Sequence, residues 1–323
     1  MSANPVRVLY VCGCGRSGST LLARMLGRLP GHLSLGELEK FWMYGLKNDH
    51  LCSCGRPFSE CGFWAPVAAK ALGPRRADDI DHILSFRRTL RLRNLVPIAS
   101  PRFRSRGYAR RFTRYLRVWR RVLEAIRDVS GSEVIVDASK APHLLFVLHH
   151  LEGVELRVVH LVRDSRAVAH SHGRKKPALE RHGSSRTIKR SGPLKAGLGW
   201  VQWNLLAEGY RRYGGNVTRL RYEDLVTDPA VQLRRIARRN GCGPETFGFL
   251  HEGRVSLTAG HLLGGNPMRF QQGDLPLRLD DEWMSIMPRR KRLLVTLVTW
   301  PLLRAYGYPL SSAAPPPRPD GSG

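Results

Sequence analysis

A glycine-rich segment near the N-terminus has the residues needed to bind a phosphate-like anion. Residues 13–20 read Gly-Cys-Gly-Arg-Ser-Gly-Ser-Thr and lie between a valine-rich run, 6–12, and an amphipathic stretch, 21–29. A strand, a glycine loop and a helix N-terminus in this order aim backbone N–H groups and the positive end of the helix dipole at one point. The order of residue types predicts an anion site, with a purely structural glycine turn as the alternative.

The segment differs from the loop of nucleoside triphosphatases at one position. The pattern GxxxxGK[ST] places a lysine before its last residue, and that lysine reaches the β- and γ-phosphates. Ser19 stands there instead, and the fixed charge of the loop is Arg16. The missing lysine, and the lack of an aspartate in a suitable context for Mg²⁺, argue against ATP or GTP chemistry. A P-loop nucleotide kinase or NTPase is therefore the second hypothesis.

Four short runs rich in Val and Ile must position such a loop. They are 6–12, 133–137, 156–162 and 216–222. Nearly continuous apolar runs of this length, separated by helical stretches, are typical of buried parallel strands. We predict an α/β fold of the P-loop nucleotide-binding type, with a central parallel sheet flanked by helices and with helical insertions. One domain would span 1–310, with a helical insertion at about 40–130 and a lid-like loop at about 173–199, and the tail 311–323 would be disordered.

The composition is that of a globular chain with a large excess of arginine. Of the 323 residues 42% are hydrophobic, which excludes general disorder, and 53 Lys and Arg against 26 Asp and Glu give a net charge of +27. Sixteen arginines fall in 75–127, and apolar positions recur at helical spacing over about 108–128. We interpret these arginines as a solvated helix face, with a basic wall over an anionic substrate as the alternative. Nucleic-acid binding is a third hypothesis, but no DNA or RNA module is recognisable, so no nucleic-acid partner is expected.

We expect a cytoplasmic protein that starts near Met1, because the sequence has neither a signal peptide nor an apolar run of about 20 residues. The longest apolar stretch, 293–303, belongs to a basic helical segment, 289–306. We interpret this segment as a core helix with a basic cap, and weak association with an anionic membrane surface is the alternative. The sequence does not indicate the oligomeric state.

Two segments resemble motifs of a known family. Arg16-Ser-Gly-Ser-Thr-Leu-Leu resembles the 5′-phosphosulfate loop of sulfotransferases that use 3′-phosphoadenosine 5′-phosphosulfate (PAPS), particularly the tyrosylprotein, carbohydrate and bacterial branches. The segment 162–171, VRDSRAVAHS, resembles the 3′-phosphate motif of that family. In that motif a strand-end arginine, here Arg163, and a serine eight residues later, here Ser171, point at one phosphate.

Further segments agree with this family in its order along the chain, over 6–309. Residues 137–142, DASKAP, are similar to its middle-strand lysine segment, and 221–225, RYEDL, are similar to the segment whose tyrosine lies near the adenosine. Residues 265–270, GNPMRF, resemble a variant of its C-terminal nucleotide loop, and 306–308 resemble its closing helix end. The chain lacks the Arg-Lys-Gly of the cytosolic aryl and steroid enzymes and has arginine where they have the loop lysine, so phenol and steroid acceptors are not favoured.

The resemblance implies that PAPS is the co-substrate and that no metal is required. The residues implied in nucleotide binding are Gly15, Arg16, Ser17, Gly18, Ser19, Thr20, Leu21, Arg163, Ser171, Tyr222 and Arg269. Sulfuryl transfer depends on in-line positioning and charge stabilisation, for which Lys140 and Arg16 are the implied groups. Glu37 is implied as the base, and Glu39 and His143 are the alternatives.

We therefore predict a PAPS-dependent sulfotransferase that acts, by in-line displacement, on a hydroxyl of a sugar, glycolipid, peptide or small molecule. Small-molecule, carbohydrate or lipid acceptors are the expected partners. The acceptor itself is not predicted, because 40–130 and 173–199, which are expected to form its pocket, contain no recognisable motif.

A cysteine cluster lies outside these motifs. His50, Cys52, Cys54 and Cys61 offer four N or S ligands, but C-x-C-x₆-C is not one of the paired spacings that indicate zinc. A disulfide, or three small packing residues, is preferred over a structural metal. We predict no metal site from this spacing.

Overall fold

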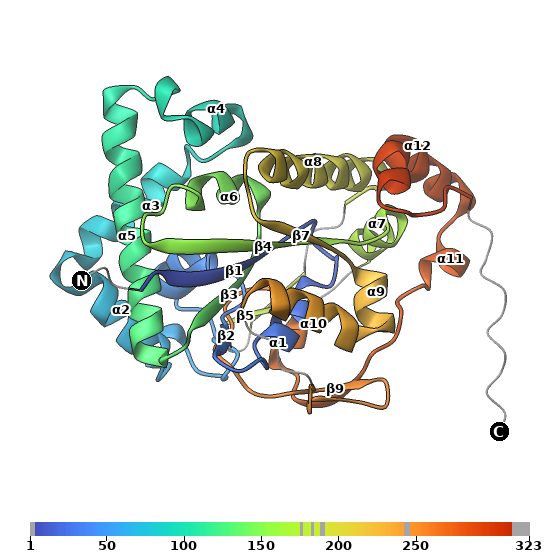
Figure 1. Ribbon diagram of the computed structural model, residues 1–323, viewed down its shortest axis with the longest axis horizontal. Coiled ribbons are helices and arrows are strands. Elements are labelled where there is room, and N and C mark those ends of the chain that lie inside the picture. The colour runs from blue at the N-terminus through green and yellow to red at the C-terminus, as the bar shows by residue number, and fades with distance from the viewer. Residues whose placement is uncertain (1–3, 175–176, 182–183, 188–190, 242–245, 312–323) are drawn as a thin grey trace.

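A five-stranded parallel sheet forms the centre of the protein, with its strands in the order β2-β3-β1-β4-β7 (Figure 1). The computed structural model describes residues 4–174, 177–181, 184–187, 191–241 and 246–311. The strands are β1 (Val6–Cys12), β2 (His32–Ser34), β3 (Val134–Lys140), β4 (Val154–Val162) and β7 (Val217–Arg221). This arrangement confirms the predicted α/β class with a central parallel sheet. The edge strand β2 was not predicted, because three residues are too short to show a pattern.

Helices cover both faces of this sheet. The α-helices of the described residues are α1 (Ser19–Leu26), α2 (Trp64–Leu72), α3 (Arg76–Arg87), α4 (Leu95–Ala99), α5 (Arg106–Ser130), α6 (Pro142–Leu148), α7 (Ser165–Gly173), α8 (Pro193–Arg212), α9 (Tyr222–Thr227), α10 (Pro229–Arg239), α11 (Trp283–Ile286) and α12 (Arg289–Ala305). A π-helical turn spans Phe41–Lys47, and a small antiparallel sheet joins β8 (Leu250–His251), β9 (Arg254–Leu257) and β10 (Gly273–Pro276). In Figure 1, α6 and α8 lie on one side of the sheet and α1 and α10 on the other.

The alternation of side chains along β1 explains the two layers. Val8 and Tyr10 point into a core shared with α2, α5 and α6, whereas Leu9 and Val11 point into a second core shared with α1, α9 and α10. Successive side chains of a strand face opposite sides of its sheet. A strand covered on both faces must be apolar at nearly every position, which is why its sequence reads as a continuous run.

The arginine-rich segment folds mainly into the long helix α5. Its bounds, 106–130, extend the predicted 108–128 by two residues at each end. Arg114 and Arg121 both pair with Asp79, a buried carboxylate of α3. Part of the expected solvated face therefore joins α5 to α3.

The segment predicted as a long loop, 173–199, ends earlier than expected. Helix α8 begins at Pro193. Proline is favoured at the first position of a helix, because the backbone N–H that proline lacks would have no partner within the helix there. Two short strands, β5 (Pro177–Arg181) and β6 (Ser184–Thr187), pair antiparallel within the segment. The rest of the lid prediction, at 175–176, 182–183 and 188–190, and the predicted disordered tail at 312–323 lie outside the described residues.

Helix α12 has one buried and one exposed face. Val295, Thr299 and Leu303 are buried against neighbouring elements, whereas the side chains of Leu293, Leu297 and Trp300 are exposed at 61%, 62% and 48%. The interpretation as a core helix with a basic cap therefore holds for only one face. Among the described residues, none of the helices combines the length and the apolar composition needed to cross a bilayer.

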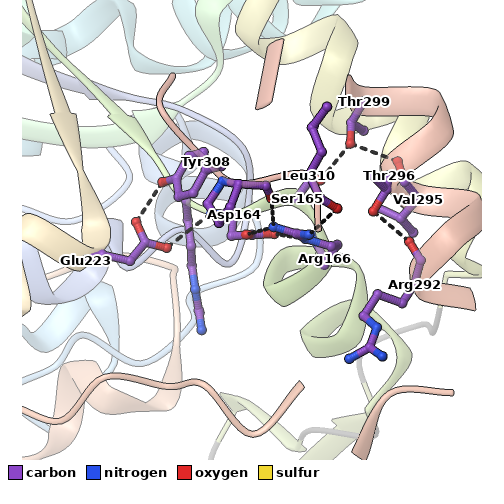
Figure 2. Close-up of polar contacts among 12 residues, drawn as sticks. Asp164, Ser165, Arg166, Glu223, Arg292, Val295, Thr296, Thr299, Tyr308 and Leu310 are labelled. Carbon is purple, nitrogen blue, oxygen red and sulfur yellow. Dashed lines mark hydrogen bonds and ion pairs between the residues drawn. The ribbon is translucent and has the colours of Figure 1, made fainter. Parts of the chain in front are cut away.

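Polar contacts fix the end of the described chain to the strand edge (Figure 2). The buried Arg166 forms an ion pair with Asp164, at 2.6 Å between Nη2 and Oδ2, and also donates to the carbonyl oxygen of Pro309 at 2.8 Å. Glu223 accepts from the hydroxyl of Tyr308 at 2.6 Å and from the backbone N–H of Asp164 at 3.2 Å. The ends of β4 and β7 are thus joined to residues that follow α12.

Candidate functional site

The residues singled out in the sequence converge at one edge of the sheet. The glycine loop follows β1, Lys140 is the last residue of β3, Arg163 follows β4, and Tyr222 follows β7. Glu37 comes three residues after β2. Because all five strands are parallel, their carboxyl ends lie side by side, and this edge is where open α/β sheets bind ligands.

Two glycines of the phosphate loop are required by close approaches. A Cβ on Gly13, whose φ is +146°, would lie 2.3 Å from the carbonyl oxygen of Leu161. A Cβ on Gly18, whose φ is +89°, would lie 2.5 Å from the ring of Tyr222. Gly18 also caps α1 and has no side chain to accept from the first N–H groups of the helix, which leaves these donors for an anion.

Ser17 and Arg163 offer further donors at this loop. Within the part of the chain that the structure describes, the buried hydroxyl of Ser17 and the Nε of Arg163 have no hydrogen-bond partner. Arg163 is 5% exposed, and its Nη1 donates to the carbonyl oxygen of Arg16 at 3.1 Å. Its guanidinium lies 4.5 Å from the ring centre of Tyr222 and pairs with Asp280 at 2.9 Å. Buried donors of this kind fit an anionic group such as a phosphate.

Glu37 and Lys140 form an ion pair beside the loop, between Oε1 and Nζ. Both side chains are mostly buried, and Lys140 has a left-handed backbone, with φ at +68°. A Cβ on Gly265 would lie 3.6 Å from Oε1 of Glu37 and 3.4 Å from the hydroxyl of Thr20. The carboxylate, the lysine and the first turn of α1 therefore lie close together.

The end of β3 holds the backbone around Glu37. Oδ1 of Asp137 accepts from the N–H of Leu38 at 3.2 Å, from the N–H of Ser139 at 2.8 Å and from its hydroxyl at 2.5 Å. The hydroxyl of Ser139 in turn accepts from the N–H of Glu39 at 2.9 Å. Burial raises the pKa of Asp137 to about 6, against the lowering effect of these hydrogen bonds.

The two alternative bases lie in a different environment. Glu39 forms an ion pair with Arg87 of α3. Burial lowers the pKa of His143, and the positive charge of Arg87 lowers it further. Of the three candidate bases, Glu37 is the one that contacts Lys140 in the described part of the chain.

The other predicted residues are placed as follows. Ser19 and Leu21 are buried in the first turn of α1, and Ser171 is buried in α7. Arg269 donates to the carbonyl oxygen of Leu51 at 3.5 Å and lies over the ring of Phe270, so these contacts join it to the segment that precedes Cys52.

Sequence reasoning missed two residues at the loop, Asp280 and His172. Asp280 pairs with Arg163 from a segment that has no motif. The imidazole of His172 would lie 3.9 Å from a Cβ on Gly15, and burial lowers its pKa. Its position one residue after Ser171 was the signal that could have identified it.

The structure corrects the prediction for the cysteine cluster. Cys52, Cys54 and Cys61 are free thiols, which contradicts the disulfide, one of the two interpretations preferred from the sequence. The histidine beside them is His261, whose Nδ1 lies 3.3 Å from Sγ of Cys61. His50 instead stacks on Tyr44, at 4.5 Å between ring centres.

The chain is similar to known proteins in its sequence and in its structure. The model of the sulfotransferase family matches residues 9–243 of the chain. Its fold is similar to the sulfotransferase domain of the olefin synthase of Synechococcus PCC 7002, with 19% identity, coverage of 95% of this chain and 97% of that one, and a TM-score of 0.49. It is also similar to the sulfotransferase domain of the curacin biosynthetic pathway, with 15% identity, coverage of 95% and 99%, and a TM-score of 0.49. A sulfotransferase from Mycobacterium avium shares 15% identity, with coverage of 94% and 78% and a TM-score of 0.45. No curated protein sequence matches the chain.

The raised pKa of Asp137 predicts a pH-dependent stability. The folded chain binds the proton of this carboxyl more tightly than the unfolded chain, with a pKa of about 6 against 3.8, so this stabilisation is present below about pH 4 and is lost as the pH rises through 6. We expect the free energy of unfolding of the wild type, relative to Asp137→Asn, to fall by up to about 3 kcal/mol between pH 4 and pH 7. Urea unfolding of both proteins across this range measures the difference. Asparagine keeps an acceptor at Oδ1, so a difference that does not change with pH would contradict the assignment.

Proposed function

The chain belongs to the sulfotransferase family, and we propose that it transfers a sulfuryl group from PAPS to a hydroxyl of a sugar, glycolipid, peptide or small-molecule acceptor. The observation that carries this proposal is the ion pair of Glu37 and Lys140 beside a phosphate loop that lacks the lysine of nucleoside triphosphatases. That arrangement places a carboxylate and a cation beside a candidate anion site. The co-substrate supplies the activated sulfuryl group, and the residues of the chain bind and orient it.

The donors at the strand edge support nucleotide binding at two points. The backbone of Gly15 to Gly18, the hydroxyls of Ser17, Ser19 and Thr20, and Arg16 would bind the 5′-phosphosulfate. Arg163 and Ser171 would bind the 3′-phosphate, with Tyr222 next to the adenosine. The unpartnered hydroxyl of Ser17 and the unpartnered Nε of Arg163, within the described residues, fit such anionic groups.

The transfer itself needs a base and a cation. Glu37 would accept the proton of the acceptor hydroxyl while the acceptor oxygen forms its bond to sulfur and the bond from sulfur to the phosphate oxygen breaks. Lys140 would stabilise the negative charge that develops on the leaving oxygen, and adenosine 3′,5′-bisphosphate leaves as the product. In the free protein each of the two side chains neutralises the other, so both are held in place before the substrates bind.

A P-loop kinase or NTPase is less well supported. Such an enzyme needs the loop lysine and an aspartate that binds Mg²⁺. Ser19 occupies the lysine position. Asp137, the aspartate of β3, uses Oδ1 for three internal hydrogen bonds.

Replacement of Arg163 tests the nucleotide site. We expect Arg163→Ala to weaken binding of adenosine 3′,5′-bisphosphate by about 10- to 100-fold, because it removes charge-assisted hydrogen bonds to a phosphate. Calorimetric titration of the purified protein measures the affinity, with ATP as the competing ligand. Arg174→Ala is the matched control, since Arg174 forms an exposed ion pair with Glu282 among the described residues. Equal binding of ATP, or unchanged binding in Arg163→Ala, would contradict the proposal.

Replacement of Glu37 tests the base. We expect Glu37→Gln to lower the rate of transfer by roughly 10²- to 10⁴-fold and to leave nucleotide binding intact, because the amide cannot accept the proton. The rate is measured as release of adenosine 3′,5′-bisphosphate from PAPS with a panel of sugar, glycolipid, peptide and small-molecule hydroxyls. Glu39→Gln is compared in the same assay. A large loss in Glu39→Gln with little change in Glu37→Gln would assign the base to Glu39.

We propose in addition that α12 docks weakly on an anionic membrane surface. Leu293, Leu297 and Trp300 form an exposed apolar stripe at spacings of four and three residues, and the exposed basic residues 289–291 precede it. An apolar stripe with adjoining basic residues is typical of helices that lie at the interface of an anionic bilayer.

Vesicle co-sedimentation tests this surface. We expect binding to vesicles that contain phosphatidylserine, weaker binding as salt is added, and loss of binding in Leu297→Ser. Leu205→Ser, at a somewhat less exposed apolar position on α8, should bind like the wild type. Equal binding to vesicles of phosphatidylcholine alone, or no binding to either, would contradict docking by charge.

A further inference from the structure

Three cysteines and one histidine from two distant segments meet at a single point. They are Cys52, Cys54 and Cys61 from the first segment and His261 from the second, and their ligand atoms all lie within 4.8 Å of one another. Cys52 and Cys61 are fully buried, whereas Cys54 is exposed. All three cysteines are free thiols.

Three of the distances between these atoms are close to the edges of a tetrahedron around a metal, and all of the distances are within 4.8 Å. Sγ of Cys54 and Sγ of Cys61 are 3.7 Å apart, and Nδ1 of His261 lies 3.7 Å from Sγ of Cys52 and 3.3 Å from Sγ of Cys61. Bonds of about 2.3 Å to sulfur and about 2.0 Å to nitrogen in a tetrahedral zinc site place two sulfurs about 3.8 Å apart and a sulfur and a nitrogen about 3.5 Å apart. A disulfide, in contrast, needs a sulfur–sulfur distance of about 2.0 Å. We propose that these four side chains bind one structural zinc ion.

The backbone presents the cysteines from a tight hairpin. Leu51 and Pro57 form an antiparallel bridge, and the N–H of Cys52 donates to the carbonyl oxygen of Arg56 at 2.9 Å. The N–H of Gly55 donates to the carbonyl oxygen of Cys52 at 2.9 Å, and Gly55 has a left-handed backbone, with φ at +85°. This turn brings the two cysteines of C-x-C to the same side as Cys61, although the spacing differs from the familiar zinc patterns.

A set of contacts around the ligands orients them. Ser53 joins the two segments, since its hydroxyl donates to the carbonyl oxygen of Gly260 at 2.8 Å and accepts from the N–H of Leu262 at 2.7 Å. The ring of His261 stacks on Phe63 at 5.1 Å, and its backbone carbonyl accepts from the indole of Trp64 at 2.8 Å. Partners that fix the orientation of ligands in this way are typical of metal sites.

The ligand set favours zinc over the harder divalent ions. Thiolates and imidazole select soft or borderline metals, and Mg²⁺ and Ca²⁺ require oxygen ligands instead. Four protein ligands leave no open position, as in structural rather than catalytic zinc sites. Binding would release the three thiol protons to solvent, because zinc binds cysteine as the thiolate.

The site lies directly before the segment that contacts Glu37. The carbonyl oxygen of Leu263, two residues after His261, accepts from the N–H of Glu37 at 2.8 Å, and the N–H of Leu263 donates to the carbonyl oxygen of Leu35 at 2.9 Å. A Cβ on Gly264 would lie 3.4 Å from the carboxylate of Glu37. The ion would therefore hold residues 261–265 against the proposed base. This consequence, unlike metal binding itself, rests on the proposed function.

Metal analysis of the full chain tests the site. The protein is purified without chelators under reducing conditions from zinc-supplemented medium, and its metal content is measured by inductively coupled plasma mass spectrometry. We expect about one zinc ion per chain in the wild type and loss of most of it in Cys54→Ser, Cys61→Ser and His261→Ala. His50→Gln, in the same hairpin, should keep the zinc ion, because His50 stacks on Tyr44 and is not one of the four residues whose ligand atoms meet.

Cobalt substitution of the wild type gives a second readout that does not depend on the folding of variants. We expect the visible bands of tetrahedral Co²⁺ and a thiolate-to-metal charge-transfer band in the near ultraviolet, both displaced by Zn²⁺. A wild type with no bound metal and no such bands would overturn the proposal, whether its three thiols titrate as free or as a disulfide. Neither measurement needs PAPS or an acceptor. Their results would therefore stand even if the proposed function were wrong.

Discussion

The parallel pairing of β1 with β3 and β4 is the constraint on which the rest of the site depends. Cys12 lies opposite Lys140 on one side and His160 on the other, so the glycine loop must emerge between the lysine and the strand that leads to Arg163. Parallel pairing also buries both faces of β1, which forces an apolar sequence up to the loop. The charged and hydroxyl side chains of the loop, from Arg16 to Thr20, therefore follow β1 at its carboxyl edge.

A second layer of polar contacts holds the residues at that edge. One oxygen of Asp137 anchors the turn that carries Glu37, and Ser139 holds the following residue. Keeping a carboxyl group fully buried is unfavourable for its charged form, as the raised pKa of Asp137 shows. The benefit is a rigid turn, since the carboxylate of Glu37 can stay next to Lys140 only if its backbone is fixed. The buried carboxyl group of Asp137 therefore lowers the stability of the fold at neutral pH, while its hydrogen bonds position Glu37.

The sequence predicted what depends on local pattern and missed what depends on distant contacts. The four longer strands, the loop and the helix α5 have residue periodicities that a window of ten to twenty residues contains. Strand β2 and Asp280 have no such pattern, and the role of Asp280 exists only because the fold places it beside Arg163. The cysteine cluster shows the same limit, because the three cysteines were visible but His261 lies 200 residues beyond Cys61. For α12, composition suggested a core helix, whereas tertiary packing covers only one of its faces.

The contacts of the last described residues have a consequence for biosynthesis. Tyr308 binds Glu223, and Pro309 binds Arg166, 143 residues earlier in the chain. A ribosome releases the chain from its N-terminus, so the sheet can begin to pair while these C-terminal residues are still being made. The polar groups at the ends of β4 and β7 then stay exposed to water until residues 308–309 have left the ribosome. The strand edge that carries the site is therefore closed only after a segment far along the chain has been made, and a nascent chain released before that segment would expose it.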